Sequence, residues 1–295
     1  MKLVRFYDPD LGGQLGVERD GTIYNISDRY ALMSAWLRHS VGRVNEAFQE
    51  FADLIDTPRT VNLADLVSVP DLNKLHYLPP IDEQDVWAAG VTYERSRAAR
   101  QEEATDGGDI YARVYGAQRP ELFFKAHGHD VIGHLGDVGI RADATWSVPE
   151  PELAVVFNPA LEVVGFTIGN DMSSRDIEGE NPLYLPQAKM YTASCALGTG
   201  ILLTASREWL DTTIQIQIQR GGETVFADST PTSRIRRTIS ELADYLGRSM
   251  QYPNGVVLLT GTGIVPPLDF TLAAGDVVSI TIDPIGTLTN TVKVV

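Results

Sequence analysis

The chain has 295 residues, which is enough for one large domain or for one domain with a smaller companion. It carries 39 acidic against 24 basic side chains, a formal net charge of −15, so we expect no nucleic-acid surface, which needs clustered Lys and Arg. Cys195 is the single cysteine, and no apolar run reaches membrane-spanning length. Because the first residues read as a strand rather than a signal peptide, we expect a soluble cytoplasmic protein without a membrane partner.

Residues 1–75 are predicted to form a small α+β lobe. Residues 1–27 read as short strands punctuated by turn sequences such as Asp20-Gly21. Residues 28–56 have apolar side chains three or four positions apart, which predicts a helix. Several prolines interrupt the segment that follows, so we place the second domain at 76–295, with 76–84 as its linker.

The second domain opens with a predicted buried strand, residues 86–91, that leads to Tyr93. A helix is predicted from Glu94 to about Ala104, and the glycine-containing segment 106–109 after it is a candidate lid. The next apolar strand is flanked by Glu121 and Lys125. These two side chains are either functional or an exposed ion pair on an edge strand.

Three carboxylates are placed to meet at the ends of two predicted strands. Glu150 and Glu152 are separated by one residue, so on a strand both point the same way. A second apolar run, 163–168, leads to Asp171 at the end of what we expect to be the neighbouring strand. Carboxylates this close favour a hard divalent cation such as Mg²⁺. The alternative is two solvated glutamates in a turn and a capping aspartate.

The remainder is predicted to be rich in antiparallel strands. Lys189 follows two prolines in a loop-like stretch, and residues 213–219 alternate strictly, as a half-buried strand does. A helix capped by Ser233 is predicted to run to about Ser249. A buried strand, 256–260, precedes Gly261-Thr262-Gly263, and strands at 277–282 and 287–294 end the domain. Many short strands with few helices favour an α+β fold, a mixed β-roll, over a doubly wound sheet.

Six motifs in order resemble the fumarylacetoacetate hydrolase superfamily over about residues 85–295. They are PELFFK, PEPEL, VVGFTIGNDMSSRD, QAK, LLTGTGIV and LAAGDVVSITIDPIGTLTNTV. The resemblance implies a β-sandwich roll with a small N-terminal lobe, assembled as a homodimer or homotetramer. It also implies Mg²⁺, with Mn²⁺ or Ca²⁺ as possible substitutes, held by Glu150, Glu152 and Asp171. The family's lysine beside the metal falls on Lys189, and the threonine of its TGTP motif falls on Thr262, although Gly263 replaces the proline.

One departure from the family pattern changes the expected reaction. Hydrolases of the family carry G-x-N-Y-x-x-H-A-x-E, in which His and Glu activate water. Here the stretch reads GVTYERSRAAR, with Tyr93 retained, Ser96 at the histidine position and Ala99 near the glutamate position. Serine is not a general base at neutral pH, so hydrolysis by that dyad is not expected.

The longer pieces instead resemble a branch of the family that dehydrates 2-keto-3-deoxy sugar acids in oxidative pentose breakdown. The resemblance implies Mg²⁺-dependent conversion of 2-dehydro-3-deoxy-D-arabinonate to 2,5-dioxopentanoate through a metal-stabilised enolate. Two rivals are a hydrolase or decarboxylase of an acylpyruvate or oxaloacetate, and a non-catalytic 2-oxo-acid-binding protein. The configuration of the substrate at C4 is not fixed by the sequence.

The dehydration needs a base and an acid beside the metal. Lys189 is the first choice for the C3 proton, since a partly desolvated lysine near a dication is a better base. Its alternative role is only to pair with a carboxylate. Glu121 is the candidate acid, and Lys125 is expected to pair with Glu121 or with the substrate carboxylate. The predicted substrate-binding residues are Thr262, Arg175, Tyr93 and Ser96, with Arg175 bracing the loop or a carboxylate.

Overall fold

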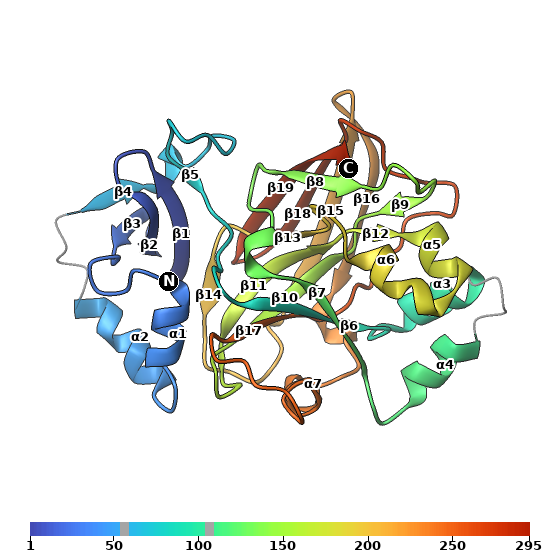
Figure 1. The fold of residues 1–295 in the computed structure, drawn as a ribbon, viewed down its shortest axis with the longest axis horizontal. Coiled ribbons are helices and arrows are strands. Elements are labelled where there is room, and N and C mark those ends of the chain that lie inside the picture. The colour runs from blue at the N-terminus through green and yellow to red at the C-terminus, as the bar shows by residue number, and fades with distance from the viewer. Residues whose placement is uncertain (54–58, 104–108) are drawn as a thin grey trace.

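The computed structural model describes residues 1–53, 59–103 and 109–295, and it has a small lobe beside a larger β-roll (Figure 1). The candidate lid at 106–109 therefore lies outside the described residues, except for Asp109, which begins α4. None of the helices in the described ranges is long and apolar enough to cross a membrane.

A twelve-stranded sheet runs through both the lobe and the roll. The order of its main path is β4 (Thr60–Asn62), β3 (Thr22–Asn25), β2 (Gly12–Arg19), β1 (Lys2–Asp8), β14 (Ile201–Leu203), β11 (Val163–Asp171), β10 (Pro151–Phe157), β17 (Val256–Leu259), β6 (Asp85–Gly90) and β7 (Glu121–Ala126). Two further strands pair off this path, β13 (Cys195–Leu197) with β11 and β5 (His76–Tyr77) with β1. The pair β17–β6 is parallel, whereas β10 and β11 are antiparallel.

A second sheet of five strands covers one face of the large sheet. Its order is β16 (Glu223–Pro231), β15 (Thr213–Arg220), β18 (Val277–Ile282), β19 (Gly286–Val294) and β8 (Asp137–Ile140), and a separate pair joins β12 (Ser173–Ser174) to β9 (Ser147–Val148). The helices are α1 (Met33–His39), α2 (Val44–Asp53), α3 (Glu94–Glu103), α4 (Asp109–Gly116), α5 (Arg175–Glu180), α6 (Leu185–Lys189) and α7 (Ile239–Leu246). Single 3₁₀ turns lie at η2 (Leu63–Asp65), η3 (Gly128–Asp130), η4 (Pro182–Tyr184) and η5 (Thr232–Arg234).

The main core lies between the two sheets. Ile214, Ile216 and Ile218 alternate with exposed glutamines along β15, and they pack in one cluster with Leu153 and Val155 of β10. The opposite face of β10 packs against the cluster that contains residues of α1. Because both faces are covered, every residue of β10 and β11 is buried, which explains their continuous apolar runs. The predicted α+β fold with a mixed β-sandwich roll is confirmed.

The lobe is joined to the roll through backbone pairing. Lys2 and Leu3 of β1 pair with Leu202 and Ile201 of β14, so the lobe extends the large sheet rather than forming its own. The expected linker contains β5, which pairs with β1. The division of the chain at residue 75 stays a prediction.

Two helix predictions were wrong in detail. The single helix expected over 28–56 is two helices, α1 and α2, because Gly42 adopts a positive φ of 71° between them, and its last residues lie outside the described ranges. Ser233 does not cap a helix. Thr238 does, since its hydroxyl accepts a hydrogen bond from the Glu241 amide at 3.1 Å, and α7 begins only at Ile239.

Candidate active site

The structure brings Glu150, Glu152 and Asp171 together at the end of the β10–β11 pair. The antiparallel register sets Glu152 opposite Gly169, and the Asp171 amide donates to the Glu150 carbonyl at 3.0 Å. All three side chains therefore project from the same side of the sheet. One oxygen of each carboxylate lies within 4.8 Å of the others, and all three residues are buried.

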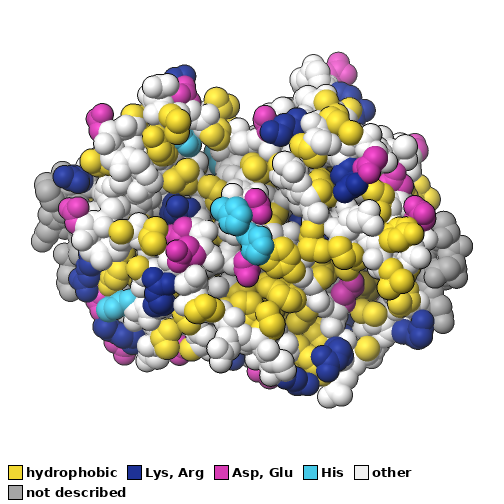
Figure 2. Space-filling view, in the orientation of Figure 1, with side chains coloured by type: hydrophobic (Ala, Val, Ile, Leu, Met, Phe, Trp, Pro, Cys, Tyr) yellow, Lys and Arg dark blue, Asp and Glu magenta, His cyan; other side chains and the backbone are white. Residues whose placement is uncertain are grey.

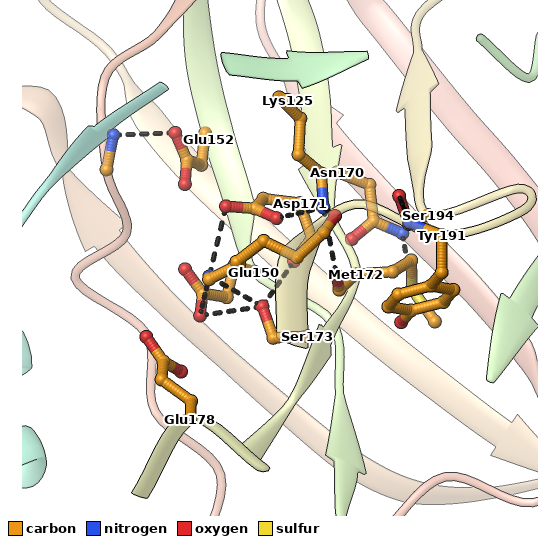
Figure 3. Close-up of polar contacts among 12 residues, drawn as sticks. Lys125, Glu150, Glu152, Asn170, Asp171, Met172, Ser173, Glu178, Tyr191 and Ser194 are labelled. Carbon is orange, nitrogen blue, oxygen red and sulfur yellow. Dashed lines mark hydrogen bonds and ion pairs between the residues drawn. The ribbon is translucent and has the colours of Figure 1, made fainter. Parts of the chain in front are cut away.

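Each of the two glutamates is fixed by its own donors. Glu152 Oε2 accepts from the backbone N–H of Gly261 at 2.6 Å. Glu150 Oε1 accepts from the Ser173 hydroxyl at 2.9 Å and forms an ion pair with Arg175 Nη2 at 3.0 Å. Figure 3 shows these carboxylates converging, with Ser173 between Glu150 and the end of β11.

The electrostatics of this cluster suit a cation. Burial raises the pKa of Glu152 well above its usual value, and the neighbouring charges of Asp171 and then Glu150 raise that pKa further. An oxygen-only set of three carboxylates is the donor set that Mg²⁺ prefers. The residues present therefore fit the divalent ion that the sequence predicted.

Lys189 lies at the centre of the carboxylate cluster. Its Nζ donates to Glu150 Oε1 at 2.8 Å, to Asp171 Oδ2 at 3.0 Å and to Ser173 Oγ at 2.7 Å. The stretch that contains it was expected to be a loop, but Lys189 ends the short helix α6, where Pro186 fits because the first turn needs no backbone donor.

Lys125 has partners different from those expected. It forms an ion pair with Asp171 Oδ1 at 2.5 Å and donates to the carbonyls of Met172, at 3.0 Å, and Lys189. Of the two expected partners, Glu121 is therefore not the one that Lys125 contacts, and pairing with the substrate carboxylate stays a prediction. The cause is a β-bulge in β7, since Phe124 and Ala126 pair with consecutive residues of β6 and Lys125 is left as the extra residue.

A small cavity of about 20 Å³ adjoins the cluster. Predicted site residues that line it are Glu150, Glu152, Asp171, Lys189, Glu121, Ser96 and Thr262. Thr262 Oγ1 accepts from the Ile264 amide at 3.2 Å, and Ser96 Oγ donates to the Tyr93 carbonyl at 2.8 Å. The structure thus gathers the predicted ligands, base and acid around one space.

Among the described residues, three predicted site residues do not line the cavity but contact residues that do. They are Tyr93, Arg175 and Lys125, which contact Ser96, Glu150 and Asp171, respectively. A Cβ on Gly263 would lie 2.6 Å from the Tyr93 ring, which gives a reason for glycine where the family motif has proline. Burial, and then the charge of Glu152, raise the pKa of Tyr93. Arg175 bridges two carboxylates, since its Nη1 lies 3.3 Å from Glu178 Oε2 while Nη2 contacts Glu150.

Glu178 and Val91 also line the cavity, although neither was predicted from the sequence. Glu178 is buried on α5, and the only signal was its position three residues after Arg175. Val91 has a φ of 51°, which is strained for a β-branched residue and costs about 1–3 kcal/mol. Strain of this kind has no signature in sequence spacing.

Comparisons with known proteins show what this chain is similar to. A family model described as "Fumarylacetoacetate (FAA) hydrolase C-terminal" matches residues 86–293. The chain is 39% identical over 292 residues to a Haloferax volcanii protein described as a probable 2-keto-3-deoxyxylonate dehydratase, with 96% of each chain covered. It is 42% identical over 226 residues to the 2-dehydro-3-deoxy-D-arabinonate dehydratase of Saccharolobus solfataricus, which covers 75% of this chain and 76% of that one. A solved structure of 2-keto-3-deoxy-D-arabinonate dehydratase, complexed with magnesium and 2,5-dioxopentanoate, is similar at a TM-score of 0.83 and 34% identity, with 100% of this chain and 99% of that chain covered.

Proposed function

Because the chain belongs to the fumarylacetoacetate hydrolase family, we propose that it catalyses the Mg²⁺-dependent dehydration of a 2-keto-3-deoxy pentonate to 2,5-dioxopentanoate. The observation that carries the proposal is that one cavity is lined by the three convergent carboxylates together with Lys189 and Glu121. The two dehydratases to which the chain is similar over most of its length support the choice of substrate.

Glu150, Glu152 and Asp171 would hold the Mg²⁺. The complex of a solved relative with magnesium supports the choice of this ion. Bound there, the ion would supply Lewis acidity to the C2 ketone of the substrate and so acidify the C3 protons. The residues of the chain then have to move protons. We assign the C3 proton to Lys189, whose Nζ lies against two of these carboxylates.

Glu121 is assigned as the acid for the departing C4 hydroxyl. Loss of a C3 proton and of the C4 hydroxyl, which leaves as water once Glu121 has protonated it, forms a C3–C4 double bond. The hydroxyls of Ser96 and Thr262, which line the same cavity, are suited to hydrogen-bond substrate oxygens. Three residues outside the cavity lining position the residues that form it. They are Tyr93, which contacts Ser96, Arg175, which contacts Glu150, and Lys125, which contacts Asp171.

The names of the two relatives are compatible with one substrate. In a 2-keto-3-deoxy pentonate only C4 remains a stereocentre, and D-arabinose and D-xylose share their configuration at C4. The D-arabinonate and D-xylonate derivatives are therefore the same compound. We propose that this compound is the substrate here.

The assembly and location are part of the same proposal, a homodimer or homotetramer in the cytoplasm. Large apolar side chains exposed on one loop, Val67 at 72%, Val69 at 60% and Leu72 at 72%, support self-association. Light scattering of the purified protein tests the assembly, and a monomer at micromolar concentration would contradict it.

The reaction is tested by incubating the protein with Mg²⁺ and 2-keto-3-deoxy-D-pentonate. We expect 2,5-dioxopentanoate, no turnover after EDTA treatment, and loss of activity in folded Glu150→Gln and Asp171→Asn. Pyruvate release from an acylpyruvate without any dehydration would establish the hydrolase instead. Metal-dependent ligand binding that survives Lys189→Ala, with no turnover in the wild type, would establish the non-catalytic binder.

A further inference from the structure

The proposed dehydration needs a second proton transfer at the far end of the substrate, and this inference rests on that proposed function. Elimination across C3 and C4 gives 5-hydroxy-2-oxopent-3-enoate. To become 2,5-dioxopentanoate, this enone must lose a proton from C5. Lys189 and the carboxylates serve the C1–C3 end, so another group must serve C5.

The cavities show which residues lie at that end. An outer cavity of about 60 Å³ adjoins the inner one. Among the described residues, those that line both cavities are Tyr111, Glu121, Glu178 and Leu185, whereas Glu150, Glu152, Asp171 and Lys189 line only the inner one. A substrate that chelates an ion at the three carboxylates would therefore direct its hydroxylated tail toward the four shared residues.

Only two of the shared residues carry a carboxylate. Glu121 is already assigned to the C4 hydroxyl, Leu185 cannot accept a proton, and the phenol of Tyr111 is a much weaker proton acceptor at neutral pH than a carboxylate. Glu178 is 6% exposed, and its Oε2 is 3.3 Å from Arg175 Nη1. Figure 3 shows the Glu178 carboxylate reaching toward the space beside Glu150, from an element separate from the β10–β11 pair.

We propose that Glu178 is the base that removes the C5 proton in the second half of the reaction. The Arg175 guanidinium contacts the Glu178 carboxylate and also contacts Glu150 at 3.0 Å. It therefore fixes the position of Glu178 relative to the predicted metal ligands. The two carboxyl groups at this end of the cavity then have opposite roles: Glu121 donates a proton to the C4 hydroxyl, and Glu178 accepts the C5 proton.

The step balances without an added reactant. Glu178 takes the C5 proton, and the C5–H electron pair becomes the C4–C5 double bond. The C3–C4 pair shifts to C2–C3, and the C2 oxygen takes up a proton, which gives a dienol. Two tautomerisations then move the hydroxyl protons to C3 and C4 and leave the ketone and the aldehyde. The sum of both halves is the loss of one water.

Glu178→Gln tests the assignment because glutamine keeps the shape and can still contact Arg175 but cannot take the proton. We expect C3 proton exchange and elimination to continue, while formation of 2,5-dioxopentanoate falls at least about 100-fold. The enone should accumulate, detectable by its conjugated absorbance and by mass. Glu180→Gln is the matched control, since Glu180 lies on the same helix and is exposed, and it should behave as wild type. Glu121→Gln should block elimination, so no enone forms.

Three outcomes would overturn the assignment. The first is wild-type formation of 2,5-dioxopentanoate by Glu178→Gln. The second is an equal loss of C3 exchange, elimination and product in that variant, which indicates a structural role; if the variant does not fold by circular dichroism, the same profile is read from Glu178→Asp. The third is a wild type that forms no 2,5-dioxopentanoate, in which case the proposed function itself fails.

Discussion

At the scale of single residues, Glu152 has two anionic neighbours and one backbone donor. Burial and the charges of Asp171 and Glu150 raise its pKa well above the usual 4.5. In the metal-free protein these carboxylates lie close together in a buried site, and Lys189 only partly offsets the repulsion at Glu152. The folded chain therefore carries a repulsion that a divalent cation would relieve.

Glu152→Gln should stabilise the metal-free protein and abolish its response to Mg²⁺. Glutamine removes one negative charge, and its carbonyl oxygen can still accept from the Gly261 amide. We expect the variant in EDTA to unfold about 2–4 °C above the wild type, which corresponds to about 1 kcal/mol. Mg²⁺ should raise the wild-type midpoint but not that of the variant. Thermal denaturation with and without Mg²⁺ measures both, and equal Mg²⁺ responses would contradict the metal assignment.

At the scale of elements, the turn after β17 places a donor beside the carboxylates. Gly261 has a φ of 88°, and a Cβ there would lie 2.1 Å from Thr92 Oγ1. The Thr92 hydroxyl is itself held by the Thr260 carbonyl at 2.6 Å. The turn can hold its position only with glycine, and its N–H then fixes Glu152.

Gly261→Ala should lose about 1–3 kcal/mol of stability and bind Mg²⁺ more weakly, because relief of the clash displaces the Glu152 donor. Gly221→Ala is the control, since Gly221 has a φ of 59° in the β15–β16 turn with nothing within 4 Å of its Cβ position. It should lose about 1 kcal/mol without any change in Mg²⁺ affinity. Calorimetric Mg²⁺ titration and urea unfolding separate the two effects, and similar Mg²⁺ affinities in both variants would contradict the argument.

A second contact between elements joins β5, in the expected linker, to the roll at His134. Its ring lies 5.7 Å from the ring of Tyr77 in β5, and its Nδ1 accepts from the Thr289 amide of β19 at 3.1 Å. Burial lowers the pKa of His134 from 6.5. Below about pH 6.5 the unfolded chain therefore binds more protons at this histidine than the folded chain does. The stability that neutral His134 contributes to the fold is complete above pH 6.5, and it is lost as the pH falls through the lowered pKa of the folded state.

We expect His134→Gln to lose less unfolding free energy than wild type between pH 7.5 and pH 5. Glutamine stays neutral and can still accept from the Thr289 amide. His129→Gln, at a side chain that is 77% exposed, should keep the wild-type slope. Urea unfolding across this pH range gives the slopes, and parallel curves for His134→Gln and wild type would show that His134 does not contribute.

At the scale of the whole molecule, the chain carries a net charge of −15. Figure 2 shows basic and acidic side chains interspersed over the visible face. The substrate carboxylate and the protein both carry negative charge, so they repel each other as the substrate approaches. Added salt shortens the screening length and weakens this repulsion.

The value of kcat/KM at saturating Mg²⁺ should therefore rise, by up to about tenfold, between about 10 mM and 150 mM salt. The value of kcat should stay nearly constant, since it does not include the encounter. Steady-state kinetics across the salt series measures both. A fall in kcat/KM with salt would show that a local positive field at the cavity outweighs the net charge.

The sequence predicted those parts of the site that depend on strand periodicity and missed those that depend on an irregularity. Glu150, Glu152 and Asp171 converge because alternation along β10 and pairing with β11 leave little freedom. The β-bulge that turns Lys125 toward Asp171 adds one residue with no compositional mark. Glu178 reaches the cavity through the placement of α5, which is set by tertiary packing. The motif resemblance supplied the reaction, which spacing alone did not.

The size of the inner cavity has a kinetic consequence. About 20 Å³ accommodates roughly one water molecule, whereas a 2-keto-3-deoxy pentonate has ten non-hydrogen atoms. A substrate of this size therefore does not fit within the inner cavity alone, and we expect the wall that Tyr111 and Leu185 share with the outer cavity to part when the substrate enters. Solvent viscosity then becomes a variable of the reaction: where opening rather than proton transfer limits the rate, turnover slows in viscous solvent and loses its isotope effect at C3.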